Sequence, residues 1–371
     1  MLSKKRLFTL ALAVLSCTLM ILCFSACSKQ EDETTAPPPT VPTTEATTKA
    51  PEPEPVNTLT GLTGISKEAV GKRPVAIMIN NITSALPQYG VAQADIMLET
   101  LVEGGITRMM AIYGDYTKVP KVCSVRSCRY YYPIFAHGFD AVYFCFGSNE
   151  TLGTPTLKRI GIDYFDGNQN YDSLVFGRDS ERLKRYSREH TAYVNGKNIP
   201  ELFKKYSIRT DYLEGRNTTA FDFREEGHAV AVGDTSADKV KLTYSSGYYS
   251  TFTYDEKNKV YLKQHNGKAH MDSVAGKQLS YTNLFVLETT IGRYKGGKLV
   301  EMDWSGGTGY YISLGKAQPI TWKKTSESSP IQVFDAQGNT LKVNAGKSYI
   351  GVINAKSTKI TQNAPTTTAA Q

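Results

Sequence analysis

The apolar positions near the start of the chain form one long run, over residues 7–24. Three basic residues precede it, two small residues follow it, and the next residue is Cys27. This order is typical of a secretory signal peptide. We therefore predict a lipoprotein signal over residues 1–27, with lipidation of Cys27 anchoring the protein to a membrane. An uncleaved membrane helix is the alternative, since about 18 apolar residues is the lower limit for crossing a bilayer.

A polar segment without aromatic residues follows, from residue 28 to residue 57. It contains seven Thr and seven Pro, and it has too few apolar side chains to bury a core. We predict a disordered Thr/Pro-rich tether over 28–57, in which extended chain advances about 3.1 Å per residue. The same composition returns near the C-terminus, which predicts a flexible tail over 356–371.

Between these segments the pattern changes to short apolar runs separated by turn residues. In the first part, runs rich in branched apolar residues predict strands at 74–79, 95–102, 107–113 and 140–146. Glu103-Gly104-Gly105 predicts a hairpin between the second and third of these. Residues that favour a helix start predict three helices, at Ser127–His137, Ser180–Ser187 and Asn198–Tyr206.

The second part is richer in strands than the first. Short runs of Tyr, Thr and Val between Gly, Asn, Asp or Lys turns predict strands at 240–244, 249–254, 260–264, 283–289, 299–304, 309–313, 319–323, 331–335 and 347–353. This spacing favours a sandwich or an open barrel. The fold class is therefore α+β, with a mixed α/β N-terminal domain at 58–216 and a β-rich C-terminal domain at 217–355.

Charge is unevenly distributed along the chain. The formal total is +8, of which 1–27 and 28–57 carry +3 and −4, leaving +9 for residues 58–371. Part of this excess is a basic stretch at 178–209. Lipid headgroups or phosphate-containing wall polymers are plausible partners, and a solvated helix face is the alternative. Nucleic acid is not expected, because export removes the chain from the cytoplasm.

The segment Val122–Arg129 is the best candidate for a functional surface. It places Arg126, Ser127 and Arg129 at the start of a predicted helix, where free amides favour an anion. Arginine can hold a carboxylate or a phosphate through two parallel hydrogen bonds. Internal ion pairs, for example with Glu99 or Glu103, are the alternative interpretation.

Cysteine and histidine residues give weaker indications. With Cys27 lipidated, Cys123, Cys128 and Cys145 remain. A disulfide between the first two is possible by spacing, but burial of all three as small hydrophobic residues is favoured.

A metal site at His265, His270 and Asp272 is disfavoured, because zinc needs three or four converging ligands. The stretch 292–298 only partly matches a phosphate-binding loop. We expect no metal and no cofactor, and assign no catalytic residue.

Several ordered motifs carry a family resemblance. They are Arg73–Asn81, Pro87-Gln88, Gln93–Ile96, Val102–Arg108 and Val125-Arg126-Ser127. The chain resembles the YerB-like lipoproteins of Gram-positive bacteria over nearly all of residues 58–354. Leu86 departs from the family's common Arg, and Cys123 and Cys128 replace small residues. The resemblance implies two domains of unknown function and a place on the outer face of the cytoplasmic membrane, and it supplies no activity.

Three functional hypotheses follow. The first is a cell-envelope binding or accessory protein for an anionic or glycan-like ligand, with candidate ligand-binding residues Asn80, Asn81, Glu103, Arg108, Arg126, Ser127 and Arg129. The second is a hydrolytic envelope enzyme whose site combines Asn80, Glu103, Arg126 and His190. The third is a structural module that binds another protein.

Overall fold

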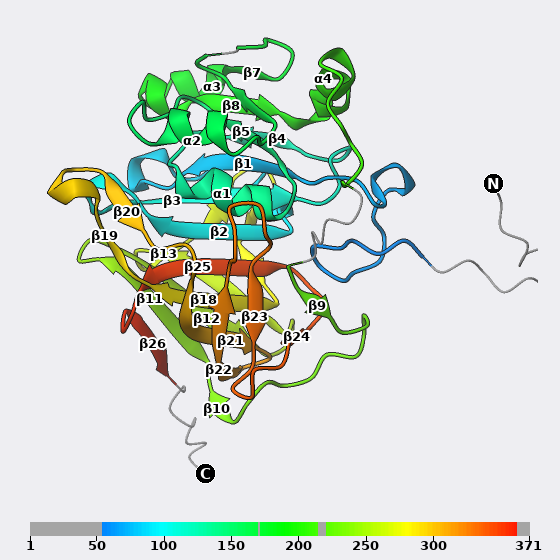
Figure 1. Cartoon of the computed structure of the whole chain (residues 1–371), viewed down its shortest axis with the longest axis vertical. Coiled ribbons are helices and arrows are strands. Elements are labelled where there is room, and N and C mark those ends of the chain that lie inside the picture. Colours follow the sequence, from blue (N-terminus) through cyan, green and yellow to red (C-terminus); the bar gives the residue numbers. More distant parts are fainter. Residues whose placement is uncertain (1–53, 170, 214–219, 362–371) are drawn as a thin grey trace, which may run out of the picture. The chain divides into compact units, whose positions relative to one another are not determined.

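The architecture is organised around one large mixed sheet to which both halves of the chain contribute (Figure 1). The structure is a computed structural model, and it describes residues 54–169, 171–213 and 220–361. The predicted signal peptide, Cys27, most of the tether and the segment 214–219 around the predicted domain boundary lie outside these residues. In the part of the chain that the structure describes, no helix is long and apolar enough to cross a membrane.

The large sheet has eleven strands, and its centre is the junction between the two halves. Its first-half strands are β2 (Ile96–Leu101), β3 (Thr107–Tyr113), β1 (Val75–Asn80), β5 (Val142–Cys145) and β6 (Tyr164–Asp166) in spatial order. Its second-half strands are β10 (Thr235–Ser236), β22 (Lys316–Lys323), β21 (Gly306–Ser313), β18 (Asn283–Thr289) and β25 (Ser348–Asn354), with β23 (Gln332–Phe334) pairing β22. Strand β25 runs parallel to both β18 and β2, so it joins the halves edge to edge.

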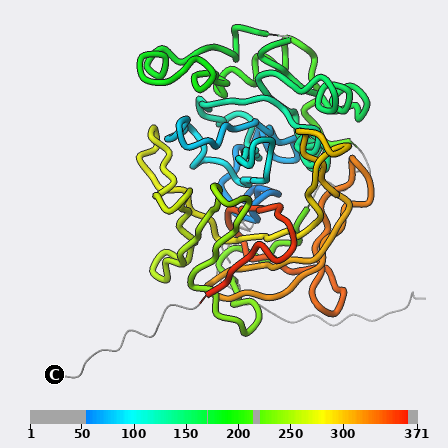
Figure 2. The backbone as a smooth tube through the Cα atoms, turned by 90° about the vertical axis from the view of Figure 1, so that its left-hand side faces the viewer, coloured from blue at the N-terminus to red at the C-terminus, as the bar shows by residue number. Residues whose placement is uncertain are grey.

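A second sheet of six strands packs on one face of the large sheet. It contains β14 (Lys268–Ala269), β13 (Val260–His265), β12 (Tyr248–Asp255), β11 (Lys239–Ser245), β26 (Thr358–Thr361) and β17 (Ser280–Tyr281). Strand β11 lies against β25 and β2, so the second sheet covers the junction. Figure 2 shows the first half above and the second half below in another view.

Smaller elements complete the layers. A three-stranded sheet contains β4 (Lys121–Cys123), β8 (Ala192–Asn195) and β7 (Phe176–Arg178), and three two-stranded sheets pair β15 (Met271–Asp272) with β16 (Lys277–Gln278), β19 (Ile291–Arg293) with β20 (Val300–Met302), and β9 (Asp222–Phe223) with β24 (Lys342–Val343). The α-helices of the described residues are α1 (Tyr131–Gly138), α2 (Gly153–Arg159), α3 (Ser180–Leu183) and α4 (Ile199–Lys205).

Both faces of the large sheet are buried, which explains why its first-half strands are apolar without alternation. One face packs against the six-stranded sheet and the three-stranded sheet, with Ile77 and Met109 among the buried residues. The other packs against α1 and α2, with Met78 and Met110 among them. The α+β class and the β-rich second half are confirmed.

Several predicted boundaries need correction. Residues 126–128 are not helical, because Arg126 N–H donates to Met78 O and Cys128 N–H donates to Gly147 O. Helix α1 therefore starts at Tyr131, and Ser127 does not cap it. The cap of α3 is Asp179, whose side chain accepts from Arg182 N–H.

Parts of the two predicted flexible segments belong to the folded body. Thr358–Thr361 form β26, paired with β11, inside the predicted tail. At the end of the predicted tether, Val56 bridges Thr63 and Asn57 is buried. Pairing with the folded body supplies the backbone hydrogen bonds that order these residues.

Candidate functional site

The predicted site residues meet where three strands of the large sheet end. Asn80, the last residue of β1, is paired with Arg108 of β3, and Leu101, the last residue of β2, is paired with Thr107. Side chains of adjacent strand residues point to opposite faces. Thr107 and Arg108 therefore belong to two different polar groups, one on each face.

The group on the α1 face is built around Arg108. This side chain is 6% exposed, and its Nη1 donates to Ser127 O. Among the described residues, no carboxylate lies within ion-pair distance of it. Burial, together with the charges of the neighbouring Arg129 and Arg126, lowers the pKa of Arg108 to about 10. An unneutralised buried guanidinium is unusual, because buried charges are normally paired.

Two arginines flank Arg108, and one carboxylate holds each of them. Arg126 Nη2 lies 2.7 Å from Glu189 Oε2, and Arg129 Nε donates to Glu103 Oε2. Both arginines are partly exposed, at 27% and 18%. The predicted alternative of internal ion pairing therefore holds for these two arginines and does not hold for Arg108.

Sequence reasoning did not assign Arg178 and Arg188 to the site, although both lie in the basic stretch it noted. Arg178 Nη1 donates to Arg188 O at 2.7 Å, and its guanidinium lies 4.3 Å from the Phe146 ring centroid. Burial lowers the pKa of Arg178, and Arg188 and Arg126 lower it further. We call Arg108, Arg126, Arg129, Arg178 and Arg188 the arginine cluster. Glu103 and Glu189 neutralise only part of its charge.

Other cations of the basic stretch have internal roles. Arg182 is buried and donates to the carbonyls of Ala85, Pro87 and His190. Lys205 Nζ pairs with Asp172 at 2.7 Å, and Arg209 pairs with Asp140 at 2.8 Å. The basic stretch is therefore neither a uniform binding surface nor a uniform solvated face.

The group on the opposite face is a buried network around Glu99 and Lys263, which we call the Glu99–Lys263 network. Lys263 Nζ lies 3.1 Å from Glu99 Oε2, and both side chains are almost fully buried. Glu99 also accepts hydrogen bonds from four side chains, Asn81, Thr107, Ser250 and Tyr349. Asn81 therefore belongs to this network and not to the arginine cluster.

The network continues beyond Lys263 to the first half of the chain. Lys263 Nζ lies 2.9 Å from Ser250 Oγ and 3.0 Å from His270 Nδ1. His270 Nε2 lies 2.9 Å from Gln88 Oε1. Each hydrogen of the Lys263 ammonium thus has an acceptor.

Asn80 contacts His190, and both residues belong to the site of the hydrolytic hypothesis. Asn80 Nδ2 lies 3.0 Å from His190 Nδ1, and Ser84 Oγ lies 3.4 Å from His190 Nε2. Because an amide nitrogen donates, His190 Nδ1 is an acceptor and the neutral ring carries its proton on Nε2. Burial lowers the pKa of His190, which favours that neutral ring. This tautomer cannot accept a proton from Ser84, as a general base would.

The structure also gives the state of the three cysteines and of the residues considered as metal ligands. Cys123, Cys128 and Cys145 are free and buried, and burial raises the pKa of Cys128 to about 12. Among the described residues, no three His, Cys, Asp or Glu side chains are grouped to hold a metal. His270 is already occupied by Lys263 and Gln88.

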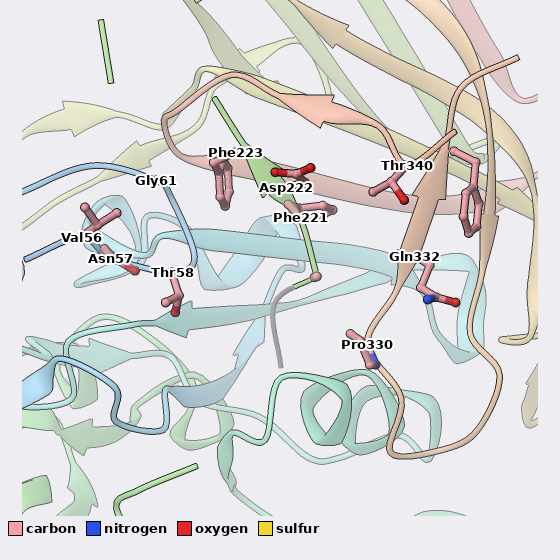
Figure 3. A pocket seen from close by; sticks show the side chains of 12 residues that line it. Val56, Asn57, Thr58, Gly61, Phe221, Asp222, Phe223, Pro330, Gln332 and Thr340 are labelled. Atoms are coloured by element: carbon pink, nitrogen blue, oxygen red, sulfur yellow. The ribbon is translucent and has the colours of Figure 1, made fainter. Parts of the chain in front are cut away.

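Two hollows of the surface lie away from the arginine cluster. One, of about 420 Å³, lies between Val56–Thr58, β9 and β23 and is lined by Phe223, Asp222 and Gln332 (Figure 3). Asp222 pairs with Lys342 at 2.7 Å, and none of the described residues that line this hollow is basic. The other, of about 350 Å³, adjoins His265.

Comparison with known proteins places the chain among relatives without assigned activity. It is 28% identical over 319 residues to the protein named "Putative lipoprotein YerB" of Bacillus subtilis (strain 168), covering 84% of this chain and 88% of that protein. The crystal structure of the YerB protein from Bacillus subtilis has the same fold, with a TM-score of 0.69 at 23% identity over 83% of this chain and 99% of that one.

The family comparison agrees with both results. The N-terminal domain described as "Protein of unknown function (DUF3048)" matches residues 59–209, and the corresponding C-terminal domain matches residues 240–350. The chain therefore belongs to the DUF3048 family, as the resemblance to YerB-like lipoproteins predicted.

Proposed function

We propose that this protein is a membrane-anchored lipoprotein that binds a phosphate-bearing anionic component of the cell envelope through its arginine cluster. The signal at 1–27 and Cys27 support the anchor, and the name of the Bacillus subtilis relative agrees with it. If the protein is anchored on the outer face of the cytoplasmic membrane of a Gram-positive cell, wall polymers and lipid headgroups can reach its arginine cluster.

The observation that carries this proposal is the unneutralised charge of Arg108. Its guanidinium is buried beside Arg126 and Arg129, and its one described hydrogen bond goes to a neutral carbonyl. An incoming anion would supply the missing opposite charge, and Arg126 and Arg129 are exposed enough to bind it directly. Phosphate suits the site because planar guanidinium groups bind its oxygens in pairs.

Arg178 and Arg188 extend the positive surface along the molecule. Arg178 meets no carboxylate among the described residues, and Arg188 is exposed. A repeating anion such as a polyphosphate chain would contact several of these groups together. We therefore favour an anionic polymer or headgroup over a neutral glycan as the ligand.

Binding of inorganic tripolyphosphate and of poly(glycerol phosphate) to the full-length protein in non-ionic detergent tests the proposal. The variant Arg126→Gln/Arg178→Gln should bind both probes about tenfold more weakly, since each charged contact contributes on the order of 1 kcal/mol or more. Binding should also weaken as salt is added. Isothermal titration calorimetry measures both effects.

The matched control is Arg185→Gln, which removes an exposed arginine of the same basic stretch. Its affinity should stay within about twofold of the unmodified protein, since an isolated surface charge contributes little. Equal losses in Arg185→Gln and in the double variant would show a non-specific charge effect. Absence of binding at low salt would refute the proposal outright.

The hydrolytic alternative has one observation in its favour, the approach of Ser84 to His190. It requires a ring with its proton on Nδ1, which the contact from Asn80 Nδ2 opposes. Glu103 is also engaged by Arg129. Hydrolysis of an ester probe that is lost in both Ser84→Ala and His190→Gln would favour this alternative over simple binding.

A further inference from the structure

A second polar feature lies apart from the arginine cluster, in the hollow next to His265. This hollow has a volume of about 350 Å³ and lies between segment 83–87 and the β13–β14 hairpin. Its walls are mainly apolar, formed by Leu86, Pro87, Ala269 and Met271, and Lys268 lines it as well. Its volume is in the range of small-molecule sites. The described residues that line it include no carboxylate.

The hydrogen bonding of His265 fixes which ring nitrogen carries the proton. His265 Nδ1 lies 3.5 Å from Asn81 Nδ2, whose hydrogens are directed at Glu99 and Thr107. An amide nitrogen cannot accept a hydrogen bond, so a proton on Nδ1 would face another donor. The proton of the neutral ring is therefore on Nε2.

His265 is neutral at physiological pH and its donor is unused. Burial, together with the charge of the nearby Lys263, lowers the pKa of His265 to about 4. The side chain is 3% exposed, and Nε2 is buried with no hydrogen-bond partner in the described part of the chain. Buried donors are nearly always paired in folded proteins, and an unpaired one is costly.

We propose that the hollow binds a small carboxylate with an apolar body, one of whose oxygens accepts the hydrogen bond from His265 Nε2. The apolar walls receive the body of the ligand, and Lys268 supplies a positive charge. Because Nε2 is covered in the free protein, entry requires a small movement of a lining side chain. Met271 and Lys268 have long flexible side chains that allow it.

Three ligands of equal length but different head groups test this assignment on the full-length protein. Hexanoate offers an acceptor and a negative charge, hexanol offers a weaker acceptor, and hexylamine offers a cation that only donates. Hexanoate should bind best and hexylamine should not bind measurably. Imidazole NMR signals of His265 should shift on addition of hexanoate and show the proton on Nε2.

Two variants separate a binding role from a structural one. His265→Phe keeps a planar ring but removes the donor, and it should weaken hexanoate binding about tenfold or more. Lys268→Gln lies on the exposed hairpin and leaves the buried network intact; it should weaken binding several-fold and reduce its salt dependence. Lys257→Gln, on the exposed β12–β13 turn, is the matched control and should bind like the unmodified protein.

The assignment would be overturned by any of three results. Hexylamine binding at least as tightly as hexanoate would mean that Nε2 accepts. Unchanged hexanoate affinity in a folded His265→Phe variant and in Lys268→Gln would place the ligand elsewhere. Absence of hexanoate binding and of any His265 shift at millimolar concentration would remove the site. Since the arginine cluster contributes no residue here, the outcome is independent of the polyphosphate experiment.

Discussion

Replacing Lys263 by methionine should destabilise the whole fold, because it leaves a buried carboxylate without its counter-charge. Lys263 comes from β13 of the six-stranded sheet, and Glu99 comes from β2 of the large sheet. Burial acts to raise the pKa of Glu99, but the charge of Lys263 and the hydroxyl donors of Tyr349 and Thr107 hold it below its ordinary value. In Lys263→Met, burial still raises the pKa of Glu99, but the charge that lowers this pKa most is gone.

The size of the effect follows from the burial of both groups. Removing one partner of a buried, hydrogen-bonded ion pair costs about 3–5 kcal/mol. An unfolding entropy of about 2.1 cal/mol/K per residue gives about 0.6 kcal/mol/K for a body of roughly 300 residues. We therefore expect Lys263→Met to lower the melting temperature by about 5–8 °C. Methionine retains most of the apolar stem, so little of this loss arises from packing.

Urea unfolding and calorimetry of the single and double variants measure the prediction. Glu99→Gln/Lys263→Met removes both charges and should recover about half of the loss, since no buried ion remains unpaired. Lys239→Met, at an exposed position of β11 in the same sheet, is the control and should change stability by less than about 0.5 kcal/mol. A change below about 1 kcal/mol in Lys263→Met would refute the reasoning. So would a double variant less stable than the single one.

Three further predictions concern the remaining features. Arg108→Met should leave the free energy of unfolding within about 1 kcal/mol or raise it, because an unneutralised buried charge is removed, while tripolyphosphate binding weakens; a loss above about 3 kcal/mol would mark the residue as structural. The pKa of His265 is about 4 in the folded state, below its value of about 6.5 in the unfolded state. At pH values between these two, the folded state binds fewer protons than the unfolded state, so stability should fall by about 3 kcal/mol from pH 7 to pH 4. Urea titrations should show a smaller pH effect in His265→Phe. Gly309→Ala should lower the melting temperature, because a Cβ there would lie 1.8 Å from Val286 O, whereas Gly292→Ala meets nothing within 4 Å and should be neutral in the same thermal scan.

The strands of the large sheet were predictable because their apolar runs are bounded by clear turns. Strands β3 and β18 match the predicted ranges 107–113 and 283–289 at both ends. The start of α1 was not predictable in the same way. Residues 126–128 carry a helix-start signal, but tertiary pairing with Met78 and Gly147 holds them extended. Local propensity is a weak guide where such pairing competes.

The arginine cluster could be predicted in part. Arg126 and Arg129 stand in the segment Val122–Arg129 and Arg108 ends the motif Val102–Arg108, and all three were predicted to contact one ligand. In the sequence, Arg178 and Arg188 are distinguished only by belonging to a basic stretch. Arg182 belongs to the same stretch, yet it is buried and donates to a backbone carbonyl. Which members face the site depends on the packing of the β7–α3 region against the large sheet, and charge patterning alone does not contain that information.

The Glu99–Lys263 network depends on a contact between distant segments, which a single sequence does not encode locally. Its position next to the arginine cluster follows from one strand, because Thr107 and Arg108 are neighbours in β3 and point to opposite faces. Thr107 donates to Glu99 in the buried network, whereas Arg108 donates to Ser127 O beside the exposed arginines. A slip of one residue in the pairing of β3 would exchange the two side chains, placing a guanidinium beside Lys263 and a hydroxyl in the arginine cluster. The network that stabilises the junction of the two halves thus also fixes the register that places Arg108 beside Arg126 and Arg129.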